Sequence, residues 1–168
     1  MRNILIAIFS VFFLNIAFAV KLPQPAVIKM QDKDIVLPGI DDARTPKVYI
    51  FKNTVNRSLW LDHPTNRRGA SAGWSSYLRP GNWSALLVDK KKFVITCSVI
   101  EPGKVTHLDC SHSVAVYAPA KVEVSSKSKG TYWLVEDKSW EELLKILEKR
   151  GIQVGKNSQK NQKVVEKL

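Results

Sequence analysis

The chain has 168 residues, with 26 Lys and Arg against 15 Asp and Glu, so its formal net charge is +11. This length fits one ordinary domain and leaves little room for two. The hydrophobic fraction of 45% excludes an intrinsically disordered chain, and the Gly and Pro residues form no repeat of the kind that fibrous proteins carry.

The first nineteen residues have the three parts of a secretory signal peptide. Arg2 supplies the positive charge, an apolar run of 11 residues extends from Ile4 to Leu14, and the segment closes with Ala17-Phe18-Ala19. The apolar run is too short for a transmembrane helix, which takes about 20 apolar residues. We therefore expect residues 1–19 to be removed on export. The remaining chain would be periplasmic or secreted, with a net charge of +10 and no transmembrane span.

The two cysteines, Cys97 and Cys110, both lie beyond the predicted signal peptide. In an oxidising compartment such a pair usually forms a disulfide, although a metal site or a catalytic thiol is the alternative. A turn at Pro102-Gly103 would place the two cysteines near each other on adjacent strands. The disulfide would close a loop of about 14 residues and contribute roughly 3 kcal/mol to stability.

Residues 20–155 are predicted to form a single β-rich domain. Residues 20–31 are typical of a leader or the start of an edge strand, and residues 32–45 of a loop with a turn at Pro38-Gly39. Short β-branched or aromatic segments then recur about every ten residues, with turn residues between them. The predicted strands are 47–51, 58–61, 74–78, 83–88, 93–100, 105–110, 114–117, 122–124, 131–135 and 152–154. This spacing predicts a mainly β fold, an antiparallel β-sandwich or a partly open barrel.

The hydrophobic period changes near the C-terminus. Ser139 and Glu142 match the Ser-x-x-Glu capping box, and Gly151 is the residue expected just after a helix. Between them, apolar residues recur at helical spacing, at Trp140, Leu143, Leu144 and Leu147. The pattern predicts one α-helix over about residues 139–150, followed by a basic, disordered tail at 156–168.

The chain contains none of the common catalytic or phosphate-binding motifs. Gly-x-Ser-x-Gly, HExxH, the EF-hand loop and GxGxxG are all missing from the sequence. A histidine could serve any of several serines as a base, namely Ser71, Ser75, Ser84 and Ser111. A second alternative is a small metal-binding, cupredoxin-like site at His63, His107 and His112, with Cys110 and Met30 added for copper. We favour a non-enzymatic protein without a cofactor, and keep the metal-binding or hydrolytic sandwich as the alternative.

Tryptophan and arginine are interleaved between positions 57 and 83. Aromatic and basic side chains together can bind sugar rings or an anionic surface, whereas large rings more often fill a core. The candidate binding residues are Trp60, His63, Arg67, Arg68, Trp74, Arg79 and Trp83. Because we expect an exported chain, the expected partner is an envelope component, an anionic glycan or a host-cell surface, and not nucleic acid.

Three segments, Leu59–Pro64, Gly69–Ser76 and Trp83–Val88, resemble the enhanced entry protein B family of Legionella and Coxiella. The predicted signal peptide and the chain length are similar too. The resemblance implies an exported protein of an intracellular bacterial pathogen that is associated with entry into host cells. It implies no biochemical activity and no site residues. The hypothesis from the sequence is therefore an exported, non-enzymatic binding protein that aids host-cell entry.

Overall fold

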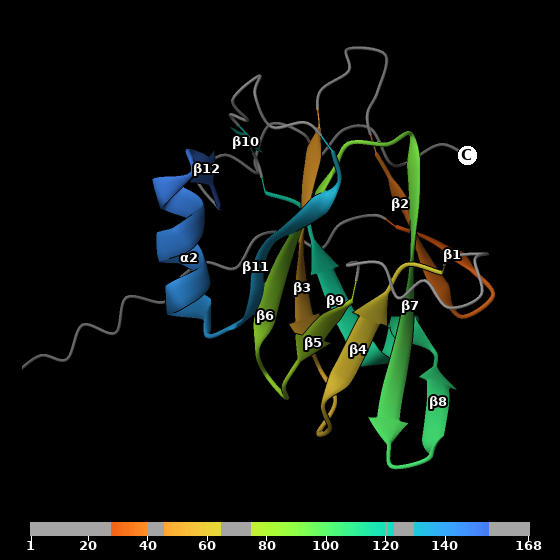
Figure 1. The fold of residues 1–168 in the computed structure, drawn as a ribbon. Coiled ribbons are helices and arrows are strands. Elements are labelled where there is room, and N and C mark those ends of the chain that lie inside the picture. Colours follow the sequence, from red (N-terminus) through yellow and green to blue (C-terminus); the bar gives the residue numbers. More distant parts are fainter. Residues whose placement is uncertain (1–27, 40–45, 65–74, 120, 123–129, 155–168) are drawn as a thin grey trace, which may run out of the picture.

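The computed structural model describes residues 28–39, 46–64, 75–119, 121–122 and 130–154. These residues form two antiparallel sheets and one ten-residue helix, arranged in layers (Figure 1). The predicted mainly β sandwich with one C-terminal helix is therefore confirmed. The predicted signal peptide at 1–19 and the predicted tail at 156–168 lie outside the described residues.

The first sheet has six strands. In spatial order these are β1 (Lys29–Gln31), β2 (Asp34–Pro38), β7 (Lys92–Glu101), β4 (Leu59–Asp62) and β5 (Ser76–Leu78), and β8 (Lys104–Leu108) also pairs with β7. The prediction of a loop over 32–45 is wrong for β2. Ile35 and Leu37 are fully buried opposite β7, and this burial outweighs the turn signals on either side.

The second sheet has four strands, in the order β11 (Tyr132–Lys138), β6 (Trp83–Val88), β3 (Lys47–Asn53) and β9 (Val114–Tyr117). Every residue of β6 is buried, because this strand is covered on both faces. Leu86 and Val88 point toward the first sheet, whereas Ala85 and Leu87 point toward the helix. A separate short pair joins β10 (Lys121–Val122) to β12 (Ile152–Gln153).

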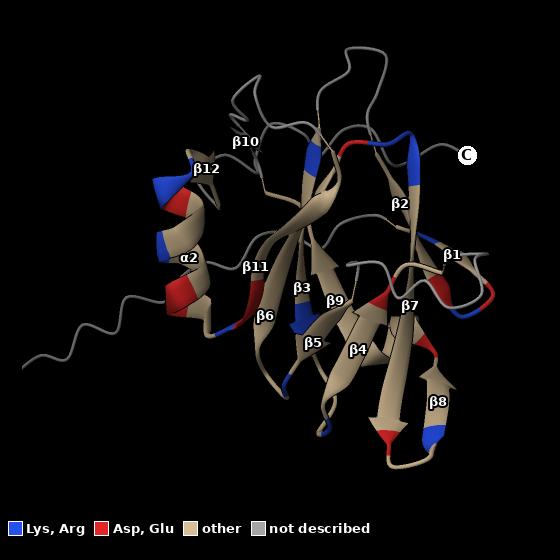
Figure 2. Ribbon diagram, in the orientation of Figure 1, with Lys and Arg blue, Asp and Glu red and all other residues tan. Residues whose placement is uncertain are grey.

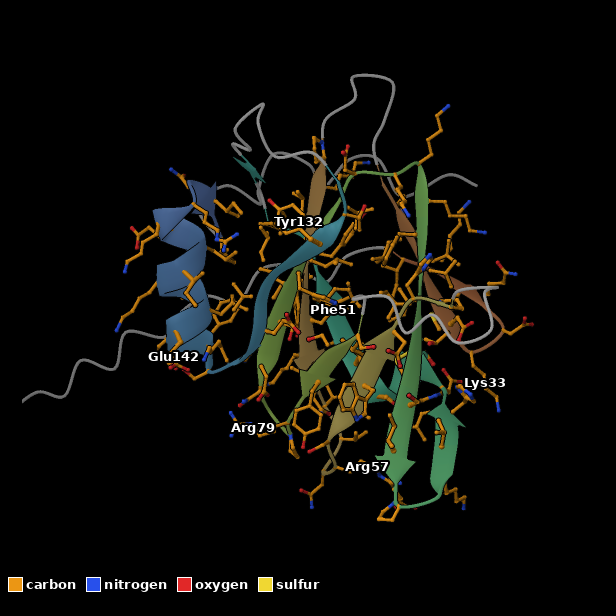
Figure 3. The ribbon with its side chains drawn as sticks, viewed as in Figure 1. Lys33, Phe51, Arg57, Arg79, Tyr132 and Glu142 are labelled. Atoms are coloured by element: carbon orange, nitrogen blue, oxygen red, sulfur yellow. A yellow bond between two sulfur atoms is a disulfide. The ribbon has the colours of Figure 1, made fainter. Side chains whose placement is uncertain are left out.

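Two hydrophobic cores lie between the three layers. The core between the sheets contains Phe51, Leu61, Leu86, Phe93 and Ile95 among others, and Phe51 is visible there in Figure 3. Tyr49 of β3 donates a hydrogen bond from its hydroxyl to the carbonyl oxygen of Pro38 in β2, which ties the sheets together. Burial raises the pKa of Tyr49 to about 12, so the phenol keeps its proton.

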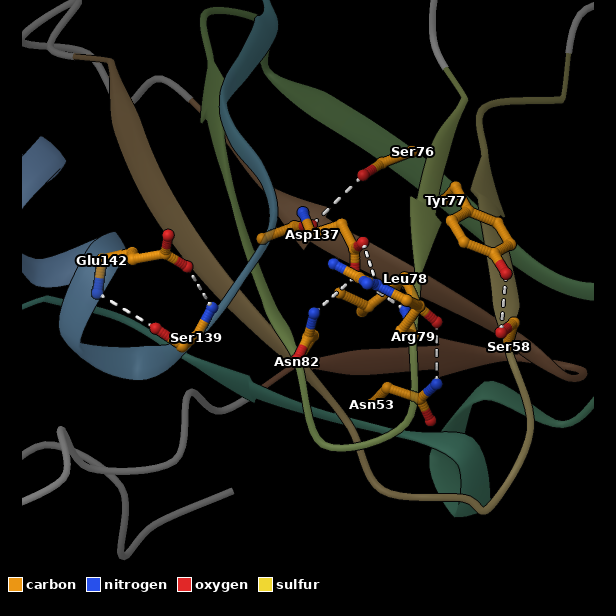
Figure 4. A network of polar contacts seen from close by, with 11 residues as sticks. Asn53, Ser58, Ser76, Tyr77, Leu78, Arg79, Asn82, Asp137, Ser139 and Glu142 are labelled. Carbon is orange, nitrogen blue, oxygen red and sulfur yellow. Dashed lines mark hydrogen bonds and ion pairs between the residues drawn. The ribbon is translucent and has the colours of Figure 1, made fainter.

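The second core lies between the four-stranded sheet and α2 (Trp140–Lys149). The predicted capping box is present: the backbone N–H of Glu142 donates to Ser139 Oγ at 3.3 Å, and that of Ser139 donates to Glu142 Oε2 at 3.1 Å (Figure 4). The hydrogen bond that the Ser139 backbone N–H donates to the Glu142 carboxylate, with a contribution from the Ser139 hydroxyl, lowers the pKa of Glu142. Gly151 follows the helix with φ of 74°, as expected of the residue after a helix end.

The disulfide between Cys97 and Cys110 is confirmed, with a Cα–Cα distance of 5.4 Å. Its setting differs from the prediction, because the strand expected over 105–110 ends at Leu108, the residue opposite Cys97. Cys110 instead begins α1 (Cys110–Ser113), a single turn whose first residues are capped by the carboxylate of Asp109. The disulfide therefore anchors this turn to the middle of β7.

Candidate functional site

The outer face of the six-stranded sheet carries a row of side chains that the register brings together. The neighbours of Trp60 in β4 are fully buried between the sheets, so Trp60 projects from the opposite face. Trp60 lies between Tyr77 of β5 and Ser98 of β7. Ser98 in turn lies opposite His107 of β8. Four strands thus contribute to one row, in which Ser98 is buried and the other three side chains reach solvent.

The two aromatic rings in this row contact each other. The ring centroids of Trp60 and Tyr77 are 5.3 Å apart, with an interplanar angle of 60°. The hydroxyl of Tyr77 donates a hydrogen bond to Ser58 Oγ at 2.8 Å, which fixes the outer end of the ring (Figure 4). Tyr77 is 41% exposed, so the pair is held in place yet open to solvent.

Two aliphatic side chains extend the row on the same face. Ile100 and Val105 lie opposite each other, two residues along from Ser98 and His107, and are 51% and 56% exposed. Of the four large hydrophobic residues that are exposed in the described part of the chain, three lie on this face. We call Trp60, Tyr77, Ile100 and Val105 the apolar patch. Large apolar side chains that gather at solvent on one face mark interaction sites.

The apolar patch carries no charge. Figure 2 shows charged residues at the ends of the surrounding strands; Asp62 ends β4, and Glu101 and Lys104 flank the β7–β8 turn. The carboxylate of Asp62 reaches the row itself, because Ser98 Oγ lies 3.5 Å from Asp62 Oδ2. Arg67, Arg68 and Trp74, which the sequence nominated as binding residues, lie outside the described residues. The four residues of the apolar patch therefore offer apolar contacts, with the Asp62 carboxylate beside them.

Trp83 does not belong to a binding surface, which corrects the sequence-based assignment. Its side chain is only 4% exposed and lies in the core between β6 and α2. Its ring is 4.4 Å from that of Trp140 and 5.5 Å from that of Tyr117, and Lys52 Nζ lies 5.2 Å from its centroid. The physical reason is the sheet pleat, which directs alternate residues of β6 to the helix side.

Arg79 is exposed, but its contacts tie together parts of the fold. Its Nε lies 2.6 Å from Asp137 Oδ2, and its backbone N–H donates to Asp137 Oδ1 at 2.8 Å (Figure 4). Asn82 Nδ2 donates to the same carboxylate at 2.8 Å. Burial alone would raise the pKa of Asp137, but the hydrogen bonds from Arg79 and Asn82 and the Arg79 charge outweigh it and lower that pKa. Arg79 thus fastens the β5–β6 turn to β11.

We expect Asp137→Asn to lower the free energy of unfolding by about 2 kcal/mol at pH 7, because charged hydrogen bonds are replaced by neutral ones. Asn also tolerates the left-handed backbone at this position, where φ is 48°. Because the folded-state pKa is lowered, the contribution of the carboxylate is present above pH 3.8, its ordinary pKa, and is lost as the pH falls through the folded value. Urea unfolding of both proteins at several pH values checks this. A difference that stayed constant down to the lowest pH would contradict it.

The three histidines lie in different settings. His63 Nδ1 is 2.7 Å from the carbonyl oxygen of Val94, and its ring stacks on Phe93 with centroids 4.1 Å apart. His107 lies in the outer row of β8, and His112 lies in α1. Within the described ranges, no group of three or more His, Cys, Asp or Glu side chains could hold a metal ion. The sulfur of Cys110 is bonded to Cys97, so it supplies no thiolate for copper.

A cluster of Asp109, Ser111 and His112 contains the residue types of a hydrolytic triad but not its geometry. The Ser111 hydroxyl oxygen and an Asp109 carboxylate oxygen approach the same imidazole atom, His112 Nδ1, at 3.1 and 3.4 Å. A triad requires the serine and the carboxylate on opposite ring nitrogens. Hydrogen bonds from Ser111 lower the pKa of Asp109, whose carboxylate caps α1. Of the other nominated serines, Ser84 is fully buried and Ser71 lies outside the described residues.

The sequence predicts Trp60 as a binding residue, but not the other three members of the apolar patch. Tyr77, Ile100 and Val105 come from three different strands. A signal was present, because each is a large apolar residue at a position where period-two alternation predicts a side chain facing solvent. Single exposed apolar residues are common, so only the register between strands shows that these lie together.

Comparisons with protein-family models, curated proteins and solved structures gave no match to this chain. The resemblance to the enhanced entry protein B family therefore remains a prediction. Among the helices that the structure describes, none is long and apolar enough to cross a membrane.

Proposed function

We propose that this chain is an exported, non-enzymatic binding protein of the bacterial envelope or secreted fraction, which aids host-cell entry and binds through its apolar patch. The observation that carries the proposal is the gathering of Trp60, Tyr77, Ile100 and Val105 on one face, where no described element packs over them (Figure 1). The disulfide is consistent with an oxidising, exported environment. The predicted signal peptide supports the same compartment.

The chemistry of the patch favours one class of partner surface. Ordered aromatic rings lose little entropy on binding, and removing aliphatic side chains from water stabilises a complex. A carboxylate- or sulfate-rich glycan would find no cation among the described patch residues. The partner that fits is therefore an uncharged surface of an envelope or host-cell component, where apolar groups can cover the rings and the aliphatic chains.

We expect Trp60→Ala and Tyr77→Ala each to weaken binding to isolated bacterial envelopes or to intact host cells by at least about tenfold, the effect of losing a central aromatic contact. The measurement is the binding isotherm of the labelled, exported chain to each preparation. Met30→Ala is the matched control, because Met30 is also apolar and 37% exposed but lies on β1.

Binding by the unmodified chain and by Met30→Ala, with loss in both aromatic variants, supports the proposal. Unfolding curves should show that each variant loses no more than about 1 kcal/mol and stays folded under the binding conditions, so that lost binding is not lost folding. If the unmodified chain binds neither preparation, or if all four proteins bind equally, the proposal is wrong.

A further inference from the structure

Strand β8 lies at an edge of the first sheet, and no described strand pairs with its outer side. In the described part of the chain, β8 pairs only with β7. Figure 1 shows β8 as the outermost strand on its side of the lower half of the sheet. Its register with β7 is regular over five residue pairs, from Glu101 opposite Lys104 to Cys97 opposite Leu108. The pairing of β8 with β7 is therefore unbroken along the whole strand.

The hairpin geometry indicates which backbone groups of β8 face outward. A two-residue turn at Pro102-Gly103 makes Glu101 and Lys104 the hydrogen-bonded pair that closes the hairpin. Hydrogen-bonded and non-hydrogen-bonded pairs alternate along an antiparallel ladder. Val105 and His107 therefore direct their backbone N–H and C=O groups away from β7. The same two residues carry their side chains on the outer face of the sheet.

Among the described residues, this edge lacks the usual protection against pairing. Natural edges are blocked by charged residues, proline or bulges. Residues 105–108 are uncharged and contain no proline, and the β7–β8 register has no shift. By contrast, β11 at an edge of the other sheet has two register shifts in its pairing with β6. The charges of β8 lie only at its ends, with Lys104 at its start and Asp109 just beyond it.

We propose that a second copy of this chain pairs with this edge, β8 against β8 in antiparallel orientation, to form a twofold dimer. The outward N–H and C=O groups of Val105 and His107 are self-complementary across a twofold axis. Val105 of one copy pairs with His107 of the other, and the two Thr106 residues face each other at the axis. Antiparallel pairing also brings the positive start of each strand, at Lys104, toward the negative end of the other, at Asp109. Charge and hydrogen bonding are thus complementary at both ends.

The dimer goes beyond the proposed function and does not depend on it. Pairing through β8 joins two six-stranded sheets edge to edge, so both apolar patches face the same side. A surface carrying several copies of the partner would then be bound at two points, which raises the apparent affinity without any new contact. The backbone pairing is short, so the dimer is expected to be weak and to depend on concentration.

The first test is the mass of the exported full chain in solution, measured by analytical ultracentrifugation up to about 1 mM. We expect a reversible monomer–dimer equilibrium. Val105→Pro removes one outward N–H from each copy and leaves the bonds to β7 intact, so the dissociation constant should rise by at least about tenfold. A chain that stays monomeric throughout overturns the proposal. So does a dimer that Val105→Pro leaves unchanged.

The second test fixes the register. Thr106→Cys places one new thiol from each copy on the twofold axis, at a non-hydrogen-bonded pair with Cα atoms about 4.5 Å apart, so it should form an intermolecular disulfide under mild oxidation. His107→Cys is the matched control, because its two thiols would lie two residues apart along the paired strands, with Cα atoms about 7–8 Å apart, beyond the usual reach of a disulfide. Peptide mapping confirms that Cys97 and Cys110 remain paired. Equal cross-linking of both variants, or of neither, contradicts this register.

Discussion

Trp83→Ala is expected to lower the free energy of unfolding by about 3–5 kcal/mol, as large-to-small substitutions of buried aromatic residues do. Trp83 is 4% exposed and fills the space between β6 and α2, where it contacts Trp140 and Tyr117. Its removal leaves a cavity that the capped helix can close only in part. Urea unfolding followed by circular dichroism measures the loss, and a change in midpoint with an unchanged slope would identify it as a stability effect.

Trp60→Ala is the matched control, because it deletes the same side chain from the other sheet. Trp60 is half-buried on an outer face, so the expected loss of stability is about 1 kcal/mol. Trp83→Ala should therefore mainly lower stability, whereas Trp60→Ala should mainly weaken binding. Equal losses of stability in both variants would show that Trp60 is a core residue and would remove the centre of the apolar patch.

The double variant Cys97→Ala, Cys110→Ala is expected to be about 3 kcal/mol less stable than the oxidised protein. The disulfide spans a sequence separation of 13, and closing a loop of about 14 residues restricts the unfolded chain by that amount. Both cysteines are buried at the junction of β7 and α1, so the disulfide also holds the start of α1 in place.

The reductant dependence of unfolding provides the control for the disulfide. A reducing agent should bring the unmodified protein close to the double variant, and should leave the double variant unchanged. Urea unfolding of both proteins with and without reductant completes the comparison. If reduction costs the unmodified protein nothing, the disulfide does not contribute as described.

Much of the fold could be predicted because hydrophobic period and turn chemistry agreed along the chain. The strand over β3 and the capped helix α2 are examples where local pattern and tertiary burial coincide. Strand β2 was missed because Pro38-Gly39 and the flanking acidic residues indicate a loop, whereas pairing with β7 buries Ile35 and Leu37. The end of β8 was placed too late, because Asp109 caps a helical turn that no hydrophobic pattern announces.

The candidate site was harder to predict, and the reason lies in the layers. Trp60 lies within a short apolar run and Trp83 begins one, and both runs follow an arginine by a few residues. Their local sequences therefore do not distinguish a surface tryptophan from a buried one. What separates them is the cover on each sheet: α2 packs over the outer face of the four-stranded sheet, while no described element covers that of the six-stranded sheet. This difference arises from contacts between segments far apart in the chain, which a single sequence does not contain.

The measurement that tests the central claim most directly is hydroxyl-radical footprinting of the exported chain, free and bound to bacterial envelopes or host cells. The account predicts protection of the exposed members of the apolar patch, Tyr77, Ile100 and Val105, together with Trp60. Side chains on the helix layer, such as Glu141 and Lys145, should react equally in both states because they face the opposite side of the molecule. Protection confined to α2, with the apolar patch unchanged, would contradict the assignment of the outer sheet face as the binding surface.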